Sequence, residues 1–270
     1  GGTAKTLAQA GVPVRDIAEI VGKPILGHRV VTLSREIHAA ILARESAEDE
    51  AELQRLGIPR IGLVCVDMYP LQAEIARPGS THDSIIEQTD IGGPTLLRSA
   101  AKAGCIVICD PADRMPGLKW LMAGCPDQQS FTDRLAAKAE AVVANYILAS
   151  AIYRGQGQYT GLIGELTQPC LYGENPWQKP AALYRDLFDN GDPLALHRFQ
   201  VVAGADASYN NWCDTDRLLH TVTHIAATFE VNYGNVPYIA VGVKHGNACG
   251  AAVGAGTLGV VAEMVAGDPR

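Results

Sequence analysis

Lys244 and His245 have the side chains needed for proton transfer near neutral pH. The apolar run over residues 238–243 predicts a buried strand that leads directly into the pair, and glycine-rich turns are predicted after His245. Histidine changes charge close to neutral pH, so it can take a proton from a weak nucleophile, and the adjacent lysine can stabilise developing negative charge. A strand-end Lys-His pair also occurs for structural reasons, so its position alone leaves both interpretations open.

Two glycine turns could bind phosphate. They are Gly1-Gly2-Thr3 and Gly92-Gly93-Pro94, and a predicted helix follows each of them. Free backbone N–H groups and the helix dipole attract anions at such a helix start. An ordinary turn, with Pro94 in the first helical position, fits the second segment equally well.

Arg98 and Lys102 are four residues apart on the predicted helix after Gly93, so they share one face. That face is either solvated or places two cations beside a bound anion. Tyr69 and Asp90 follow strand or turn units, where the ligand sites of open α/β sheets collect.

Other reactive side chains favour structural roles. His220 and His224 are four apart on a predicted helix that lacks the glutamate of a zinc-hydrolase motif. They are expected on an exposed helix face, and no metal site is expected. Seven scattered cysteines form no disulfide framework, which favours a reducing compartment, and Cys105 and Cys109 are expected in the core.

The elements that position these residues alternate between apolar runs and helical patterns. This alternation predicts an α/β fold with a parallel sheet covered by helices. A Gly/Gln/Thr-rich stretch over 155–169 suggests a boundary between a first domain, 1–160, and a second, 161–270. The first domain is expected to lack its first strand. The predicted strands are 61–67, 105–109 and 238–244, and the predicted helices are 4–10, 82–89, 95–103, 131–154 (with Ser130 and Asp133 as a capping box), 215–229 and one from about 257.

Composition narrows the class of function. The chain has 270 residues, of which 47% are hydrophobic, and a net charge of −7. This length and composition can bury a substantial core. Without a Lys/Arg run, nucleic-acid binding is not expected. No uninterrupted apolar stretch reaches about 20 residues, and no signal peptide is recognised, so a cytoplasmic protein without a membrane span is expected.

Taken together, the motifs resemble the bifunctional purine-biosynthesis family that combines an AICAR transformylase with an IMP cyclohydrolase. The matching segments occur in order along essentially the whole chain. Those of the cyclohydrolase half are Gly-Gly-Thr-Ala-Lys5, Arg29-Val-Val-Thr-Leu33, Met68-Tyr-Pro70, Asp90-Ile-Gly-Gly-Pro94 and Leu97-Arg-Ser-Ala-Ala-Lys102; those of the transformylase half are Tyr172-Gly-Glu-Asn-Pro176, Ser208-Tyr-Asn-Asn211, Lys244-His245 and Asn247-Ala-Cys-Gly250.

The resemblance implies a methylglyoxal synthase-like parallel sheet domain followed by part of a cytidine deaminase-like α/β domain, and a homodimer. It implies formyl transfer from 10-formyltetrahydrofolate to AICAR, then cyclisation to IMP without a metal. The small-molecule partners would be purine ribonucleotides and folate. The catalytic residues it implies are Lys244, His245, Lys102, Tyr69 and Asp90. The substrate-binding residues it implies are Gly2, Thr3, Arg29, Thr32, Gly92, Gly93, Tyr172, Asn211 and Asn247.

Four segments depart from the family pattern. Val31 replaces a lysine, Ser34-Arg35 replaces a His-Pro pair, Leu171 replaces an arginine expected to bind phosphate, and Trp177 replaces a histidine. Two other functions are therefore considered beside that of a purine-biosynthesis enzyme. One is a nucleotide-binding relative that acts as a scaffold or regulator, and the other is a methylglyoxal synthase-like enzyme with another phosphorylated substrate.

Overall fold

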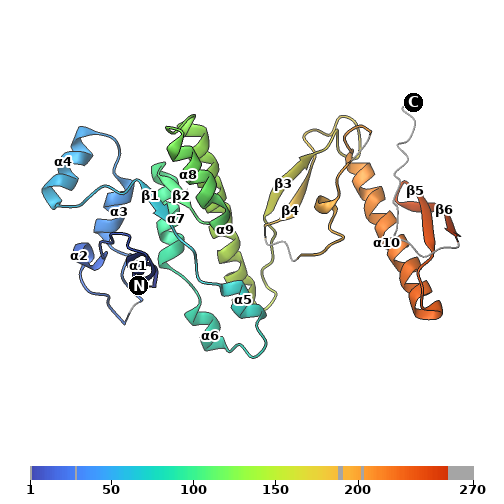
Figure 1. The fold of residues 1–270 in the computed structure, drawn as a ribbon, viewed down its shortest axis with the longest axis horizontal. Helices are drawn as coiled ribbons and strands as arrows, with labels where there is room; N and C mark the ends of the chain where they lie inside the picture. The colour runs from blue at the N-terminus through green and yellow to red at the C-terminus, as the bar shows by residue number, and fades with distance from the viewer. Residues whose placement is uncertain (1, 28, 188–190, 202–203, 255–270) are drawn as a thin grey trace. The chain divides into compact units, whose positions relative to one another are not determined.

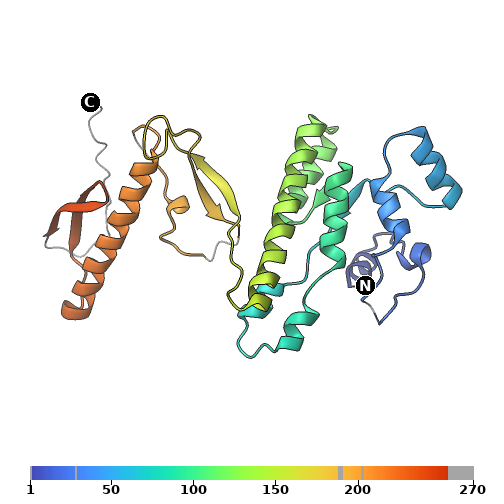
Figure 2. The same ribbon diagram turned by 180° about the vertical axis from the view of Figure 1, so that it is seen from behind.

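The computed structural model describes residues 2–27, 29–187, 191–201 and 204–254 (Figure 1). The chain forms two compact units, Gly1–Ile163 and Gly164–Arg270. Figure 2 shows the same elements from behind. The first unit contains α1 (Gly2–Gln9), α2 (Ala18–Val21), α3 (Arg35–Leu42), α4 (Ala47–Leu56), β1 (Leu63–Cys65), α5 (Leu71–Ala76), α6 (His82–Glu87), α7 (Gly92–Ala103), β2 (Ile106–Ile108), η1 (Pro111–Asp113), α8 (Arg114–Met122) and α9 (Gln128–Gly155). The second contains β3 (Gly164–Pro169), β4 (Ala182–Asp186), η2 (Leu196–Arg198), α10 (Tyr209–Tyr233), β5 (Tyr238–Lys244) and β6 (Asn247–Gly254).

The first unit is built on a parallel pair of short strands. β1 pairs with β2 in the register Leu63↔Ile106 to Cys65↔Ile108, and α5, α6 and α7 lie between them in the chain. The predicted parallel sheet with helical connections is therefore confirmed here. Both strands are shorter than the predicted runs 61–67 and 105–109, because the flanking residues belong to connections rather than to the ladder.

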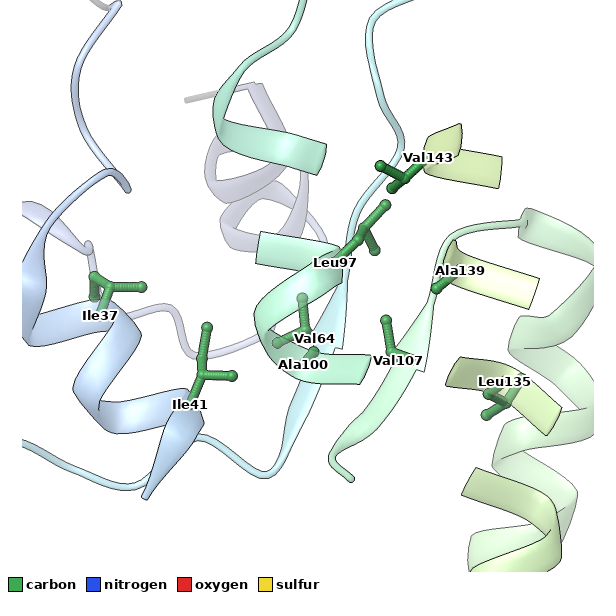
Figure 3. Packing of buried hydrophobic residues seen from close by; sticks show 9 residues of the cluster. All are labelled: Ile37, Ile41, Val64, Leu97, Ala100, Val107, Leu135, Ala139 and Val143. Atoms are coloured by element: carbon green, nitrogen blue, oxygen red, sulfur yellow. The ribbon is translucent and has the colours of Figure 1, made fainter. Parts of the chain in front are cut away.

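Apolar stripes on three helices pack around this sheet. α3 contributes Ile37 and Ile41, α7 contributes Leu97 and Ala100, and the strands contribute Val64 and Val107 (Figure 3). These spacings of three and four residues place the side chains of each helix on one face. The stripe of α9 consists of Leu135, Ala139 and Val143.

α9 begins earlier than predicted. It starts at Gln128, so Ser130 lies inside the first turn and the predicted capping box with Asp133 is wrong. The start is anchored from outside the helix, because Trp120 stacks on Phe131 at 4.2 Å between ring centroids and donates through Nε1 to Pro126 O. By length and composition, α9 alone among the described helices could cross a membrane; here it packs on β2 and α7.

The second unit is antiparallel. β3 pairs with β4, and β5 pairs with β6 from Tyr238↔Gly254 to Lys244↔Asn247. The predicted strand 238–244 is confirmed. The glycine-rich turns expected after His245 are wrong, because residues 247–254 form β6; the helix predicted from about 257 lies outside the described residues.

α10 packs against both strands of the β5–β6 hairpin. It starts at Tyr209, six residues before the predicted start, because Ser208 and Asn211 form a capping box. Among the residues of β5, Ile239 is buried, whereas Tyr238, Ala240 and Gly242 are exposed. The expectation of a fully buried strand before His245 is therefore wrong, since one face of β5 is open.

Candidate active site

In the first unit, the loop before α7 gathers several of the predicted site residues. The Asp90 N–H donates to Tyr146 Oη at 2.8 Å, and Asp90 Oδ1 accepts from the Gly93 N–H at 2.9 Å. The carboxylate therefore caps the first turn of α7, while the tyrosine on α9 holds its backbone. A turn was expected over 90–94, but Gly92, Gly93 and Pro94 already belong to the helix.

The two glycines allow this close approach. A Cβ at Gly93 would overlap the carboxylate of Asp90 and lie 3.2 Å from Val66 Cγ1, and a Cβ at Gly92 would lie 3.0 Å from Thr32 Oγ1. Thr32 and Asp90 thus both lie close to the helix start. The Gly93 N–H already bonds Asp90, so a phosphate at this helix start would need other donors.

The 29–32 segment lies beside the same loop. Arg29 Nη2 is 3.6 Å from Glu87 Oε2 at the end of α6, and both side chains are more than half exposed. The structure therefore brings Arg29, Thr32, Asp90 and the Gly92–Gly93 pair into one neighbourhood.

Tyr146 was not recognised from the sequence. It is 3% exposed, and its hydroxyl donates to Gln88 O at 2.8 Å. Burial raises the pKa of the Tyr146 hydroxyl, and the hydrogen bond from the Asp90 N–H opposes this rise. Tyr69 is 47% exposed and lies two residues before Leu71, which packs in one buried cluster with Tyr146. A buried tyrosine needs a hydrogen-bond partner, but sequence does not reveal which one.

Lys102 lies at the other end of α7 from Asp90. It lies in the last turn of α7, ten residues after Gly92, which is about 15 Å along a helix axis. A cation there stabilises the helix dipole. Arg98, on the same face, lies 4.0 Å from Glu140 on α9.

Gly2 and Thr3 lie in α1, which buries no side chain. The Gly2 carbonyl accepts a hydrogen bond from Thr6 Oγ1 at 3.1 Å. Their predicted role in binding substrate remains a prediction. Val31, which replaces the family lysine, is half-buried between Arg29 and Thr32.

In the second unit, Lys244 and His245 lie at the tip of the β5–β6 hairpin. Lys244 pairs with Asn247, so the connection is the two-residue turn His245-Gly246, with φ of 53° and 72°. Asn247 Nδ2 donates to His245 O at 2.9 Å. Both catalytic candidates are exposed. The positive φ values are those of the tight two-residue turns that suit the twist of a β-hairpin.

A bulge adjoins the tip. Gly242 pairs with Gly250 and Val243 with Ala248, which leaves Cys249 as the extra residue. Its Sγ donates to Gly242 O at 3.3 Å. A bulge re-aims the residues that follow it, so Cys249 has a structural role next to the pair.

The first turn of α10 collects the remaining candidates. The Tyr209 N–H donates to Tyr172 O at 3.0 Å, and Asn210 Nδ2 donates to Glu174 O at 2.9 Å. Asn211 Oδ1 accepts from the Ser208 N–H at 2.9 Å. Tyr172 and Asn211 are thus brought together, with Asn211 Oδ1 engaged in capping. Leu171 and Trp177 are exposed nearby in sequence, at 43% and 78%.

The structure also describes the histidines of α10 and the two cysteines beside β2. His220 and His224 are exposed on α10, as predicted, and the His224 Nδ1–H donates to His220 O at 2.7 Å. Within the described residues, no group of three or more His, Cys, Asp or Glu side chains could hold a metal ion. Cys105 and Cys109 are half-buried beside β2, and burial raises the pKa of both thiols.

These features define an α/β protein with candidate sites at a strand-helix loop in one unit and at a hairpin tip in the other. Residues 100–270 match the family described as the AICARFT/IMPCHase bienzyme, and residues 1–95 match the MGS-like domain. The chain belongs to the AICARFT/IMPCHase bienzyme family, whose members are enzymes. The predicted methylglyoxal synthase-like first domain is thereby confirmed.

Individual relatives agree with this assignment. The chain is 39% identical to a bifunctional purine biosynthesis protein PurH of Neisseria gonorrhoeae (strain NCCP11945), over 96% of this chain and 50% of that protein. It is 37% identical to the PurH of Desulfitobacterium hafniense (strain DSM 10664 / DCB-2), over 100% of this chain and 52% of that protein. The chain thus spans about half the length of these curated relatives.

A solved structure is also similar. The crystal structure of ForH matches 59% of this chain and 84% of its own chain, with 35% identity and a TM-score of 0.51. This likeness supports the fold over the matched part.

Proposed function

We propose that the protein acts in de novo purine biosynthesis. It transfers a formyl group from 10-formyltetrahydrofolate to AICAR and closes the formylated product to IMP. The observation that carries this proposal is the exposed Lys244-His245 pair at the tip of the β5–β6 hairpin. The turn at this tip is hydrogen-bonded to Asp214 of α10, and the first turn of the same helix contains Asn211 and bonds Tyr172. The relatives named PurH are described as bifunctional purine biosynthesis proteins, which favours the same reaction pair.

In formyl transfer, the substrate amine is a weak nucleophile and must lose a proton as it attacks the formyl carbon. The bond between the formyl carbon and N10 of the folate then breaks, and tetrahydrofolate leaves with a proton on that nitrogen. His245 accepts that proton, and Lys244 stabilises negative charge that develops on the formyl oxygen. Tyr172, Asn211 and Asn247 orient the ribonucleotide. The reaction needs no metal in this scheme, since proton transfer and charge stabilisation come from side chains.

In ring closure, the amide nitrogen attacks the formyl carbonyl and water is lost. Tyr69 and Asp90 are the groups that flank this step, with Arg29, Thr32, Gly92 and Gly93 binding the nucleotide. Gly2 and Thr3 complete the proposed nucleotide contacts. Lys102 is also proposed to act in ring closure. Because it lies at the far end of α7 from Asp90, this role is tested by a variant of its own.

The full-length protein tests this function in two assays. Incubation with the formylated ribonucleotide should yield IMP, and Asp90→Asn should abolish that yield. Loss of IMP in Lys102→Ala would assign Lys102 to the reaction despite its distance from Asp90. Incubation of AICAR with 10-formyltetrahydrofolate should yield the formylated ribonucleotide, and His245→Ala should prevent it.

Two outcomes would overturn the proposal. Purine ribonucleotide binding without either reaction would favour a scaffold or regulator, a reading motivated by Val31 and Leu171. Tight binding of triose phosphate, without binding of purine ribonucleotides, would favour a different phosphorylated substrate.

A cytoplasmic location and a homodimeric state are further parts of the proposal. Cell fractionation measures the location, and sedimentation measures the oligomeric state.

A further inference from the structure

The turn that carries His245 has an uncommon backbone. Both of its residues have positive φ, 53° at His245 and 72° at Gly246. This pattern matches the tight hairpin turn that usually contains Asn-Gly or Asp-Gly. A left-handed conformation is unfavourable for most L-residues other than glycine, so a histidine at the first position is stabilised by contacts with its surroundings.

That support comes from Asp214 on α10. Its Oδ1 accepts the Gly246 N–H at 2.6 Å, across 32 residues of sequence, and the contact is partly buried. The hairpin ladder closes at Lys244↔Asn247, so the amides of the two turn residues lie outside it. A carboxylate acceptor makes a stronger hydrogen bond than a neutral oxygen, and it therefore fixes the turn against the helix.

The same helix holds the other candidates of this unit. The Tyr209 N–H in the first turn of α10 donates to Tyr172 O, and Ser208 and Asn211 form the capping box at the start of the helix. Asp214 lies within two turns of that start. One rigid element thus fixes the position of His245 relative to Tyr172 and Asn211.

We propose that Asp214 is a positioning residue for formyl transfer, and that it acts by holding the His245-Gly246 turn in the geometry that aims the imidazole at the substrate amine. The inference rests on the proposed role of His245. Without Asp214 the hairpin remains, but its tip can exchange between turn conformations. A displacement of about 1 Å at a reacting group can lower a rate on the order of 100-fold.

The test compares three variants of the full-length protein. Asp214→Ala removes the acceptor, and Asp214→Asn keeps an oxygen in the same place. Asp216→Ala is the matched control, because Asp216 is an exposed aspartate two residues along the same helix. For each variant, kcat and KM for AICAR are measured at temperatures where circular dichroism shows the protein folded, and the Gly246 amide is followed by NMR after glycine labelling.

We expect Asp214→Ala to lower kcat at least about tenfold with KM changed less than about threefold, because positioning affects the transition state more than ground-state binding. Asp214→Asn should recover kcat to within about threefold of the wild type, since its amide oxygen accepts the same hydrogen bond. The Gly246 amide proton should shift upfield in Asp214→Ala alone. Asp216→Ala should match the wild type.

The failure outcomes are distinct. If the wild type transfers formyl groups and His245→Ala does not, an unchanged kcat in folded Asp214→Ala overturns this inference alone. An equal loss in Asp214→Ala and Asp216→Ala also overturns it, since the effect would then not be specific to the turn. If His245→Ala retains wild-type transfer, the proposed role of His245 fails, and the inference fails with it.

Discussion

The hydroxyl of Tyr146 on α9 accepts the backbone N–H of Asp90, 56 residues earlier, at 2.8 Å. The same hydroxyl donates to Gln88 O, so one buried side chain bridges the two ends of the 88–90 segment. The consequence is that the position of the Asp90 carboxylate depends on the packing of α9.

Tyr146→Phe removes both hydrogen bonds while keeping the ring in the core. Two bonds of about 0.5–1.5 kcal/mol each would lower the free energy of unfolding by about 1–3 kcal/mol. Ring closure should fall as well, because Asp90 loses its backbone anchor. Chemical denaturation and an IMP assay measure the two effects.

The control for this change is Tyr153→Phe on the same helix. The Tyr153 hydroxyl lies 3.2 Å from Nδ1 of the exposed His82, so removal of this hydroxyl should change stability by less than about 0.5 kcal/mol. Equal losses in the two variants would contradict the role assigned to Tyr146.

Gly93→Ala should disturb the same loop by a different route. The added methyl group would overlap the Asp90 carboxylate and crowd Val66 Cγ1 at 3.2 Å, which forces one of them to move. Overpacking of this kind typically costs about 1–3 kcal/mol. Ring closure should fall with it, as measured in the IMP assay on folded protein.

Gly62→Ala is the matched glycine control, because a Cβ there meets nothing within 4 Å. It should leave stability and IMP formation at wild-type levels. A Gly93→Ala variant as active and stable as Gly62→Ala would mean that Asp90 can move at no cost.

His245→Asn separates the backbone role of the residue from its chemistry. Asparagine tolerates positive φ, so the hairpin and the thermal midpoint should be retained. General acid–base catalysis contributes roughly 100- to 10,000-fold, so formyl transfer should fall by at least about 100-fold. Retained transfer would show that the imidazole is not the base.

The cysteines should differ in alkylation. Burial raises the pKa of the Cys109 thiol to about 11, and the nearby Lys138 offsets this only in part. The group is therefore protonated at pH 8, and the thiolate is the reactive form. Exposed Cys65 should react with iodoacetamide at least about tenfold faster than Cys109 in the folded protein. Peptide mass spectrometry of a time course measures both rates, and denaturant should remove the difference.

The raised pKa of Cys109 also has a consequence for stability. A thiol whose folded pKa lies above its unfolded value of 9.0 favours the folded state below pH 9, and this contribution is lost as pH rises from 9 toward about 11. Cys109→Ala should therefore lose less stability than the wild type between pH 8 and pH 10, as followed by urea denaturation.

The sequence alone identified the order of the motifs, the parallel connection from β1 to β2, and the extent of β5. These features depend on local information, because apolar runs, helical spacing and turn residues lie next to one another in the chain. It also placed Lys244 and His245 at the end of a strand and predicted an exposed face for His220 and His224.

The tertiary structure alone decided which of these residues meet. Thr32 lies close to Gly92, and Asp90 is hydrogen-bonded to Tyr146. The Gly246 N–H of the hairpin turn is hydrogen-bonded to Asp214, and Lys102 lies at the opposite end of α7 from Asp90. The structure also showed that residues 247–254 pair as a strand, whereas their glycines had suggested turns. Such contacts depend on how helices pack and strands pair across tens of residues, and local sequence patterns carry no record of that packing.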